Sequence, residues 1–192
     1  MSLISLDNVG KLFKNQVVIN QLNLSIDQGE LMLLIGKNGS GKSTLLKLIA
    51  GIIPLTNGNI IRQFMRHSYL PEKIEMPLFI NAFDYIKTIH EINQTMIDSR
   101  LIERLNLNLE KGIHQLSKGN QKRIMVYLCF SHQAELILLD EPFDGLDDET
   151  QDELILLIKE YQKKGITFIV STHEPEKFKD SQVRVIHFDA MG

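Results

Sequence analysis

A glycine-rich segment, residues 36–44, constrains the fold of this chain more than any other feature of its sequence. It reads Gly-Lys-Asn-Gly-Ser-Gly-Lys-Ser-Thr, it follows the apolar run Leu31–Ile35, and it precedes a stretch with helical character, residues 45–50. Glycines permit backbone angles that turn successive N–H groups inward, and the positive end of the following helix points at the same place. A strand, a glycine-rich loop and a helix in this order predict a binding loop for phosphate groups. The alternative is a glycine-rich turn that only caps a helix.

The Gly-x-x-x-x-Gly-Lys-Ser spacing of this loop also predicts separate tasks for its side chains. Lys42 would reach the β- and γ-phosphates of a nucleoside triphosphate, and the Ser43 hydroxyl would bind a Mg²⁺ ion that bridges them. The candidate nucleotide-contacting residues are Gly36, Asn38, Gly39, Ser40, Gly41, Lys42, Ser43 and Thr44.

Composition limits the class of protein. With 192 residues, of which 43% are hydrophobic, the chain can bury one full core, so we expect a single domain with room for a small insertion. The net charge of −3 gives no general attraction to nucleic acid or to an anionic membrane. No apolar run reaches the roughly 18 residues of a spanning helix, and the first residues show neither a basic leader nor a cleavage site. We therefore expect a cytoplasmic protein that neither inserts into a membrane nor binds nucleic acid.

The single cysteine, Cys129, cannot form an internal disulfide, which agrees with a reducing compartment. Met125 and Leu128 beside it suggest an apolar helix face, so we expect Cys129 in the core and not as a nucleophile.

Two hydrophobic patterns divide the chain. Apolar and polar residues alternate over residues 22–27, which predicts an antiparallel sheet with one solvent-exposed face. Phe83, Ile86 and Ile89 recur at helical spacing instead, which predicts helices after about residue 72. We therefore predict one α/β domain over residues 1–192, in which residues 1–71 and 118–192 form the core and residues 72–117 form a helical insertion.

A second buried-strand pattern, Leu136–Asp140, ends in two acidic residues, Asp140 and Glu141. Ligands of open parallel sheets bind at the carboxyl ends of the strands. One carboxylate beside Mg²⁺ can hold the ion, and a second one farther out can orient an attacking water. The alternative is a pair of acids that merely ends a strand.

Five segments, taken in order over nearly the whole chain, resemble the nucleotide-binding subunit of ABC transporters. They are residues 36–44, 116–123, 136–142 and 144–147, and His173. Residues 116–120, Leu-Ser-Lys-Gly-Asn, are similar to the family signature Leu-Ser-Gly-Gly-Gln, with Lys118 and Asn120 as the two changes. The resemblance implies a P-loop NTPase fold of the ABC ATPase type, with an antiparallel β subdomain, a mixed or parallel core sheet and an inserted helical subdomain.

The resemblance also implies roles for individual residues. Ser117 and Gly119 would face the γ-phosphate held by an opposing subunit. Asp140 would lie on the metal side, Glu141 would orient the attacking water, and His173, at the position of the family's switch histidine, would steady that water. The alternative for residues 116–123 is a segment that only caps a helix with Ser117.

Two further residues, Phe13 and Glu72, can each be interpreted in two ways. Phe13 stands where the family places an aromatic ring that stacks on adenine, although an ordinary sheet residue is nearly as compatible with the sequence. Glu72 stands where the family often has glutamine, so it would reach Mg²⁺ or water, and the alternative is an exposed loop acid.

From the resemblance we expect an ATPase that uses ATP and Mg²⁺ and pairs head to tail with a second ATPase subunit, identical or different. We expect it to be peripheral to the plasma or inner membrane through a permease. The permease would dock near Glu72, where Leu78, Phe79 and Phe83, with Met76, would form an apolar patch. Residues 69–72 and the short C-terminus favour export over import. The alternatives are a non-transport ATPase of the same type and a nucleotide-dependent regulatory module without turnover.

Overall fold

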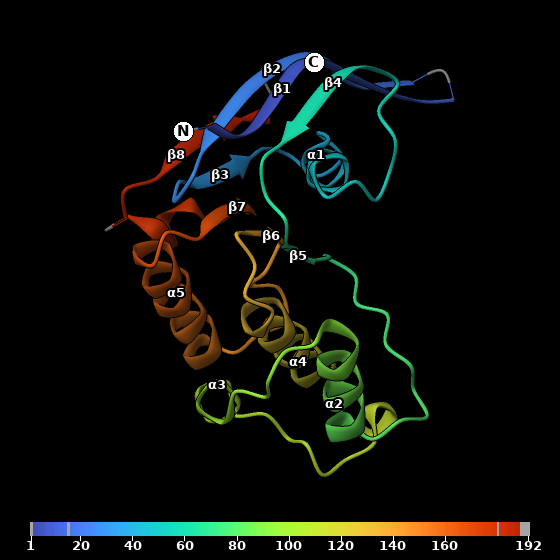
Figure 1. Ribbon diagram of the computed structural model, residues 1–192, viewed down its shortest axis with the longest axis vertical. Coiled ribbons are helices and arrows are strands. Elements are labelled where there is room, and N and C mark those ends of the chain that lie inside the picture. Colours follow the sequence, from blue (N-terminus) through green and yellow to red (C-terminus); the bar gives the residue numbers. More distant parts are fainter. Residues whose placement is uncertain (1, 15, 180, 189–192) are drawn as a thin grey trace.

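The computed structural model describes residues 2–14, 16–179 and 181–188, and these residues form two sheets (Figure 1). The antiparallel sheet has the order β2-β1-β4, and its strands are β1 (Ser2–Phe13), β2 (Gln16–Asp27) and β4 (Asn57–Arg62). The second sheet has the order β5-β6-β7-β3-β8, and all its pairs are parallel. Its strands are β3 (Leu31–Ile35), β5 (His67–Leu70), β6 (Leu136–Asp140), β7 (Thr167–Ser171) and β8 (Arg184–His187).

The predicted antiparallel sheet with one exposed face is confirmed. Along β2, Leu22, Leu24 and Ile26 are buried, and the residues between them are exposed. Successive side chains of a strand point to opposite faces, so the alternation in sequence becomes one apolar face and one polar face.

The parallel sheet is covered on both sides, and alternate residues of β3 belong to two different cores. Met32 and Leu34 pack against the helix α1 (Lys42–Ile49) and the antiparallel sheet. Leu31 and Leu33 pack with the helices on the opposite face. Burial on both faces explains the continuous apolar run that precedes the glycine-rich loop.

Four helices lie on the opposite face of the parallel sheet or beyond it (Figure 1). They are α2 (Ala82–Asn93), α3 (Ser99–Arg104), α4 (Lys118–Ser131) and α5 (Asp148–Lys163), and 3₁₀ turns occur at η1 (Ile113–Gln115) and η2 (Pro175–Phe178). The three longer ones begin with side-chain caps: Asn81, Ser117 and Asp147 each accept a hydrogen bond from a backbone N–H of the first turn. Acidic residues in the first turn of α5 and Lys163 in its last turn match the helix dipole.

The helix α2 confirms the helical spacing predicted around residue 86. Ile86 is buried, Ile89 is half-buried and Phe83 is exposed. This helix is joined to α4 by the buried His90, whose Nε2 lies 2.9 Å from the Tyr127 hydroxyl. Cys129 of α4 is buried, and desolvation raises the pKa of its thiol to about 12, which confirms a core residue.

Candidate active site

The glycine-rich loop bends between β3 and α1 as the sequence predicts. Gly41 caps α1 with φ of 105°, a backbone angle that favours glycine. A Cβ atom at this position would lie 3.1 Å from the carbonyl oxygen of Val18, so a side chain there would press on β2. Gly39 also has a positive φ, of 83°. The loop is therefore shaped by its glycines, with α1 beginning directly behind it.

Lys42, the first residue of α1, is buried and turns its ammonium toward the loop. Its Nζ donates to the carbonyl oxygens of Gly36 at 2.7 Å and Lys37 at 3.3 Å. The same atom lies 3.7 Å from Glu141 Oε1. A desolvated cation thus lies between the loop and the acidic end of β6.

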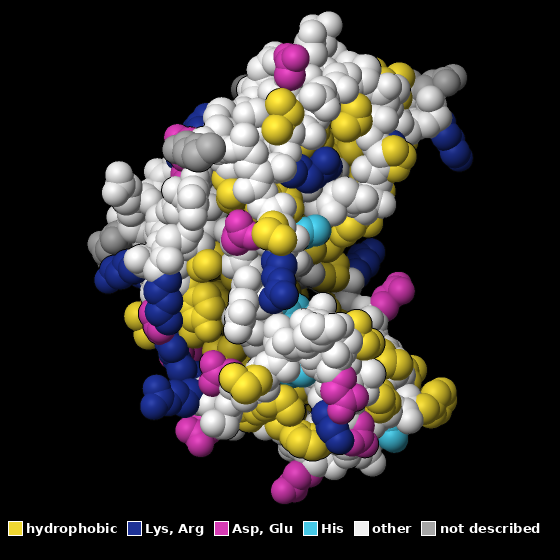
Figure 2. All heavy atoms as spheres, in the orientation of Figure 1, with side chains coloured by type: hydrophobic (Ala, Val, Ile, Leu, Met, Phe, Trp, Pro, Cys, Tyr) yellow, Lys and Arg dark blue, Asp and Glu magenta, His cyan; other side chains and the backbone are white. Residues whose placement is uncertain are grey.

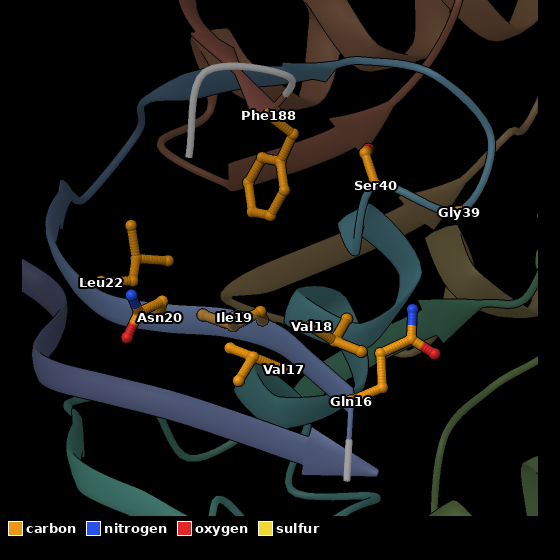
Figure 3. Close-up of a pocket in the computed structure, with 9 residues that line it drawn as sticks. All are labelled: Gln16, Val17, Val18, Ile19, Asn20, Leu22, Gly39, Ser40 and Phe188. Atoms are coloured by element: carbon orange, nitrogen blue, oxygen red, sulfur yellow. The ribbon is translucent and has the colours of Figure 1, made fainter. Parts of the chain in front are cut away.

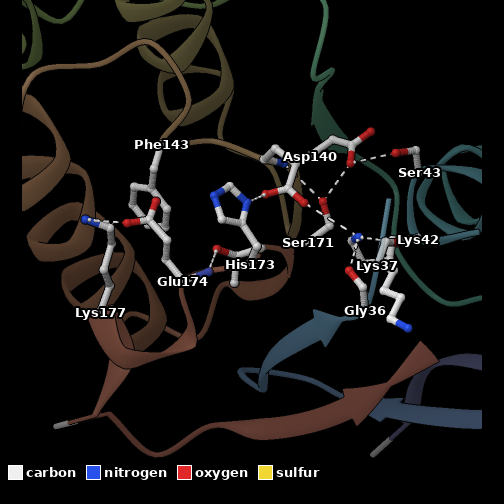
Figure 4. A network of polar contacts seen from close by, with 12 residues as sticks. Gly36, Lys37, Lys42, Ser43, Asp140, Phe143, Ser171, His173, Glu174 and Lys177 are labelled. Carbon is white, nitrogen blue, oxygen red and sulfur yellow. Dashed lines mark hydrogen bonds and ion pairs between the residues drawn. The ribbon is translucent and has the colours of Figure 1, made fainter. Parts of the chain in front are cut away.

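Asp140, at the carboxyl end of β6, is buried and accepts three hydrogen bonds. Its Oδ1 accepts from Ser43 Oγ at 3.0 Å and Ser171 Oγ at 2.6 Å, and its Oδ2 accepts from the Tyr69 hydroxyl at 3.1 Å (Figure 4 shows the two serines). Burial, followed by the nearby Asp140 carboxylate, raises the pKa of Tyr69 well above its usual value, so its hydroxyl keeps its proton and donates. The adjoining oxygens of Ser43 and Asp140 are hard donors of the kind that Mg²⁺ prefers, so this pair fits the ion.

Glu141 differs from Asp140 in both backbone and side chain. Its φ is 45°, in the left-handed region that residues other than glycine rarely adopt. Its N–H donates to Ser171 Oγ at 3.0 Å, and its Oε2 lies 3.1 Å from His173 Nδ1. Its Oε1 is buried and makes no hydrogen bond with the described residues, although the Lys42 ammonium is nearby. One carboxylate oxygen thus keeps its hydrogen-bonding capacity for another donor.

A loop, residues 141–147, follows β6 and packs against the start of α4. Gly119 lies so close to it that a Cβ atom there would come within 2.8 Å of the Gly145 carbonyl oxygen. Ser117, at the cap of α4, is exposed, and its Oγ accepts from the N–H of Asn120 at 3.2 Å. Both predicted signature residues therefore lie at the amino end of α4.

Phe13 and Glu72 lie outside the polar network around Asp140. Phe13 is exposed at the end of β1, and the Lys11 ammonium lies 4.8 Å from its ring centroid. Glu72 is exposed and lines a groove with Lys122 and Asp144; among the described contacts it makes no hydrogen bond with Ser43 or Asp140.

A pocket of about 210 Å³ lies between β2 and the glycine-rich loop (Figure 3). Its walls are mostly apolar, and the ring of Phe188 lies on the side opposite β2. It is lined by Gln16, Val17, Val18, Ile19, Asn20, Leu22, Gly39, Ser40 and Phe188. The pocket is next to the loop that is predicted to hold phosphates. The ring of a nucleotide bound at that loop would therefore fit against the apolar walls of the pocket.

A second possible cation site adjoins Glu141. Glu141, Asp144 and His173 each offer one ligand atom, and these atoms all lie within 4.8 Å of one another. In the searched part of the chain this is the one group of three or more such side chains. Asp144 and His173 are exposed, so the group is open to solvent.

The face of the molecule drawn in Figure 2 carries charges of both signs. On the face in Figure 2, Lys and Arg side chains are interspersed with Asp and Glu side chains. No helix among the described residues combines the length and the apolar character needed to cross a bilayer.

Three polar side chains in this site were not predicted from the sequence. Tyr69 and Ser171 hold Asp140, and Lys122 of α4 donates to the backbone carbonyl of Glu141 at 2.6 Å. Ser171 had a partial signal, because it ends the apolar run of β7 in the same way as Asp140 ends that of β6. Lys122 lies within residues 116–123, which resemble the family, but the sequence there does not show whether its ammonium is buried or exposed.

Comparison with known proteins places these features in a family. The family model described as ABC transporter matches residues 19–144. The zinc import ATP-binding protein ZnuC of Hydrogenovibrio crunogenus is 32% identical over 90% of this chain and 73% of its own length. The lantibiotic transport ATP-binding protein SrtF of Streptococcus pyogenes is 31% identical over 89% of this chain and 80% of its own length.

Solved structures show the same fold. The ATP-binding cassette MJ0796, in a dimeric post-hydrolysis state bound to ADP and Pi, superposes with a TM-score of 0.83 over 96% of this chain and 93% of its own, at 21% identity. An ATP-binding subunit of an ABC transporter gives a TM-score of 0.85 over 97% of this chain and 87% of its own, at 23% identity.

Proposed function

Because this chain belongs to the ATP-binding subunits of the ABC transporter family, which are ATPases, we propose that it couples ATP-driven dimerisation and hydrolysis to transport by a separate membrane subunit. The observation that carries this proposal is the meeting of Lys42, Ser43, Asp140, Glu141 and His173 at one edge of the parallel sheet. They come from three separate parts of the chain, and each has the chemistry that one step of phosphoryl transfer requires.

In the proposed reaction, the loop N–H groups and Lys42 bind the triphosphate, and the charge of Lys42 stabilises the phosphates as the bond breaks. Glu141, whose Oε1 makes no hydrogen bond with the described residues, accepts a hydrogen bond from water and takes up its proton as the water oxygen attacks the γ-phosphorus. The bond from that phosphorus to the bridging oxygen breaks, and ADP keeps the electron pair. His173 holds the Glu141 carboxylate at Oε2.

Ser43 and Asp140 would hold Mg²⁺, which neutralises charge on the phosphates when it is bound. We also assign Glu72 to the surroundings of this Mg²⁺ ion, farther from it than Ser43 and Asp140. Phe13 is assigned to stacking on adenine, although it does not line the apolar pocket next to Ser40.

A second subunit completes the site in this proposal. Ser117 and Gly119 lie at the amino end of α4, where a helix dipole and exposed N–H groups favour an anion. We assign them to the γ-phosphate of ATP bound to the opposing subunit. The dimeric structure of the cassette MJ0796 supports this pairing. A homodimer is the simplest arrangement, and a second, different ATPase subunit is the alternative.

The membrane partner is assigned to the segment from Glu72 to α2, which we treat as part of an insertion over residues 72–117. Phe79 is 98% exposed, and Leu78 and Phe83 are 50% and 43% exposed. Several large apolar side chains exposed to solvent within one short segment support a protein contact there. Docking there would hold the subunit at the cytoplasmic face of the membrane. Residues 69–72 favour export, and the named relatives include both a zinc import protein and a lantibiotic transport protein.

The proposal is tested by ATPase assays across a range of protein concentrations. Activity per molecule should rise with concentration and then level off, because each site needs Ser117 from another subunit. Ser117→Ala should lower the plateau and leave ATP binding to the monomer intact. Constant activity per molecule in a proven monomer would contradict the two-subunit site.

Capture of the partner tests the transport assignment. The tagged subunit should retain a protein with several spanning helices from detergent-solubilised membranes. Hydrolysis without such a partner would favour a non-transport ATPase, and ATP binding without hydrolysis would favour a regulatory module.

A further inference from the structure

Lys122 is a buried lysine with an unusual partner. It lies on α4, five residues after the cap residue Ser117, and only 4% of its surface is exposed. Its Nζ donates to the backbone carbonyl of Glu141 at 2.6 Å. Removing an ammonium from water is costly, so a lysine in this position needs a strong compensating interaction. Desolvation lowers the pKa of Lys122, while the nearby Asp144 and Glu141 carboxylates oppose that effect.

The accepting residue, Glu141, has a backbone that needs support. Its left-handed φ of 45° is unfavourable for a residue with a side chain. The following Pro142 restricts the conformation further. A backbone in such a state persists only when its surroundings fix it.

The hydrogen bonds of the Glu141 peptide groups show what fixes it. Its N–H is held by β7, through Ser171. Its carbonyl accepts from Lys122 and, at 3.4 Å, from the N–H of Asp144. The bond from Lys122 is the shorter of the two, and its donor is charged, which makes it the stronger one.

Other contacts join the same helix to the same loop. Arg123, next to Lys122, forms an ion pair with Asp147 at the far end of residues 141–147. Gly119 allows α4 to approach the Gly145 carbonyl oxygen closely. The helix therefore contacts the loop at its beginning, middle and end, and Lys122 is the contact at the residue that bears the carboxylate.

We propose that Lys122 is a positioning residue that fixes the backbone of Glu141, and through it the direction of the carboxylate toward the attacking water. The inference rests on the proposed function, because it assumes that Glu141 acts on water. It adds a residue outside the phosphate loop and the strand end, and it makes α4, the helix capped by Ser117, a support of the catalytic carboxylate in its own chain.

The test is Lys122→Met, which removes the ammonium and keeps the length of the side chain. Turnover should fall about tenfold to a hundredfold, because small misplacements of a reacting group have effects of this size. KM for ATP should stay within about twofold, since the phosphate-binding groups are untouched. Lys122→Arg, which keeps a charged donor, should recover part of kcat. The matched control is Lys163→Met, the same change at an exposed position of α5.

A double-mutant cycle with Glu141→Gln separates positioning from general damage. If Lys122 acts through the Glu141 carboxylate, Lys122→Met should cause little further loss in single-turnover assays of Glu141→Gln. An equal fold-loss in both backgrounds would overturn the inference, and so would parent-like turnover in Lys122→Met. If Lys122→Met does not fold, Lys122→Gln serves instead, with folding checked by circular dichroism. A kcat at the parent value in Lys122→Gln, whose amide donor sits on a shorter side chain, would also overturn the inference.

The controls distinguish this inference from the function on which it rests. If the parent protein fails to hydrolyse ATP, or if Glu141→Gln hydrolyses it at the parent rate, the proposed function fails first. Suppose instead that the parent is active, that Glu141→Gln is inactive, and that Lys122→Met turns over ATP at the same rate as Lys163→Met. Then only the role proposed for Lys122 is wrong.

Discussion

The carboxyl end of β6 and the segment around α2 differ in the kind of side chain that they bury and the kind that they expose. At the end of β6, Asp140 is 1% exposed and three side-chain hydroxyls hold it. Before and along α2, Phe79 is 98% exposed and Phe83 is 43% exposed, while the opposite side of the helix packs into the core through Ile86 and through His90 with Tyr127. Polar groups are buried where chemistry is proposed, and apolar groups are exposed where a partner is proposed.

This contrast separates two kinds of sensitivity to mutation. A buried polar network leaves an unpaired group whenever one member is removed, so single changes there have large effects. An exposed apolar side chain contributes little to folding, so its loss should affect only binding to a partner. The predictions below test this division, from the largest effect to the smallest.

Lys42→Ala should reduce ATP binding and turnover to background, because it removes the buried cation that faces the loop carbonyls and Glu141. The measurement is nucleotide titration together with phosphate release. Near-normal hydrolysis by a folded Lys42→Ala protein would refute the assignment of the phosphate loop.

Glu141→Gln should lower hydrolysis by about a hundredfold or more, because the shape stays and the proton acceptor is lost. ATP should still bind, and ATP with Mg²⁺ should convert the variant into a lasting dimer on size exclusion, whereas ADP should not.

Asp140→Asn is the matched comparison for Glu141→Gln, since it also replaces a carboxylate by an amide one residue away. It should weaken the dependence on Mg²⁺ along with turnover, because its oxygens adjoin Ser43. If both variants behave alike, the separate roles of the two acids are wrong.

Phe79→Ser should leave the ATPase activity of the isolated subunit unchanged and its stability within about 0.5 kcal/mol of the parent. It should reduce capture of the membrane partner. Leu156→Ser, a change of an exposed apolar residue on α5, is the control and should not reduce capture. Loss of hydrolysis in Phe79→Ser would show that the two regions are not separable.

The smallest expected effect is a loss of stability in acid at His90, which joins α2 to α4. Desolvation lowers the pKa of His90 below its usual value, so the folded protein binds fewer protons at this residue than the unfolded chain does. The contribution of His90 to stability is therefore complete well above pH 6.5 and is lost as the pH falls below it. Unfolding measured at pH 7.5 and 5.5 should show a lower Tm in acid. His90→Gln should reduce that difference; an unchanged difference would assign it to other groups such as His132, whose ring centroid lies 6.1 Å away.

Much of the fold was predictable because its signals are local. The alternation along β2, the apolar runs of β3 and β6 and the helical spacing in α2 each follow from residues close together in sequence. The glycine-rich loop belongs to the same class, since its shape depends on glycines and on the elements directly before and after it. The sequence alone therefore determined the α/β class, the glycine-rich loop between β3 and α1, and the acidic strand end.

Only the tertiary structure decided which distant parts of the chain come into contact. Tyr69 meets Asp140 because β5 pairs with β6, although the two residues are 71 positions apart. Lys122 meets the carbonyl of Glu141 because α4 packs beside the loop that follows β6. The sequence around a lysine does not show whether its ammonium lies in water or against a strained backbone. That depends on the packing of elements that are remote in the chain, and the free energy of the contact arises only after the sheet and its helices have come together.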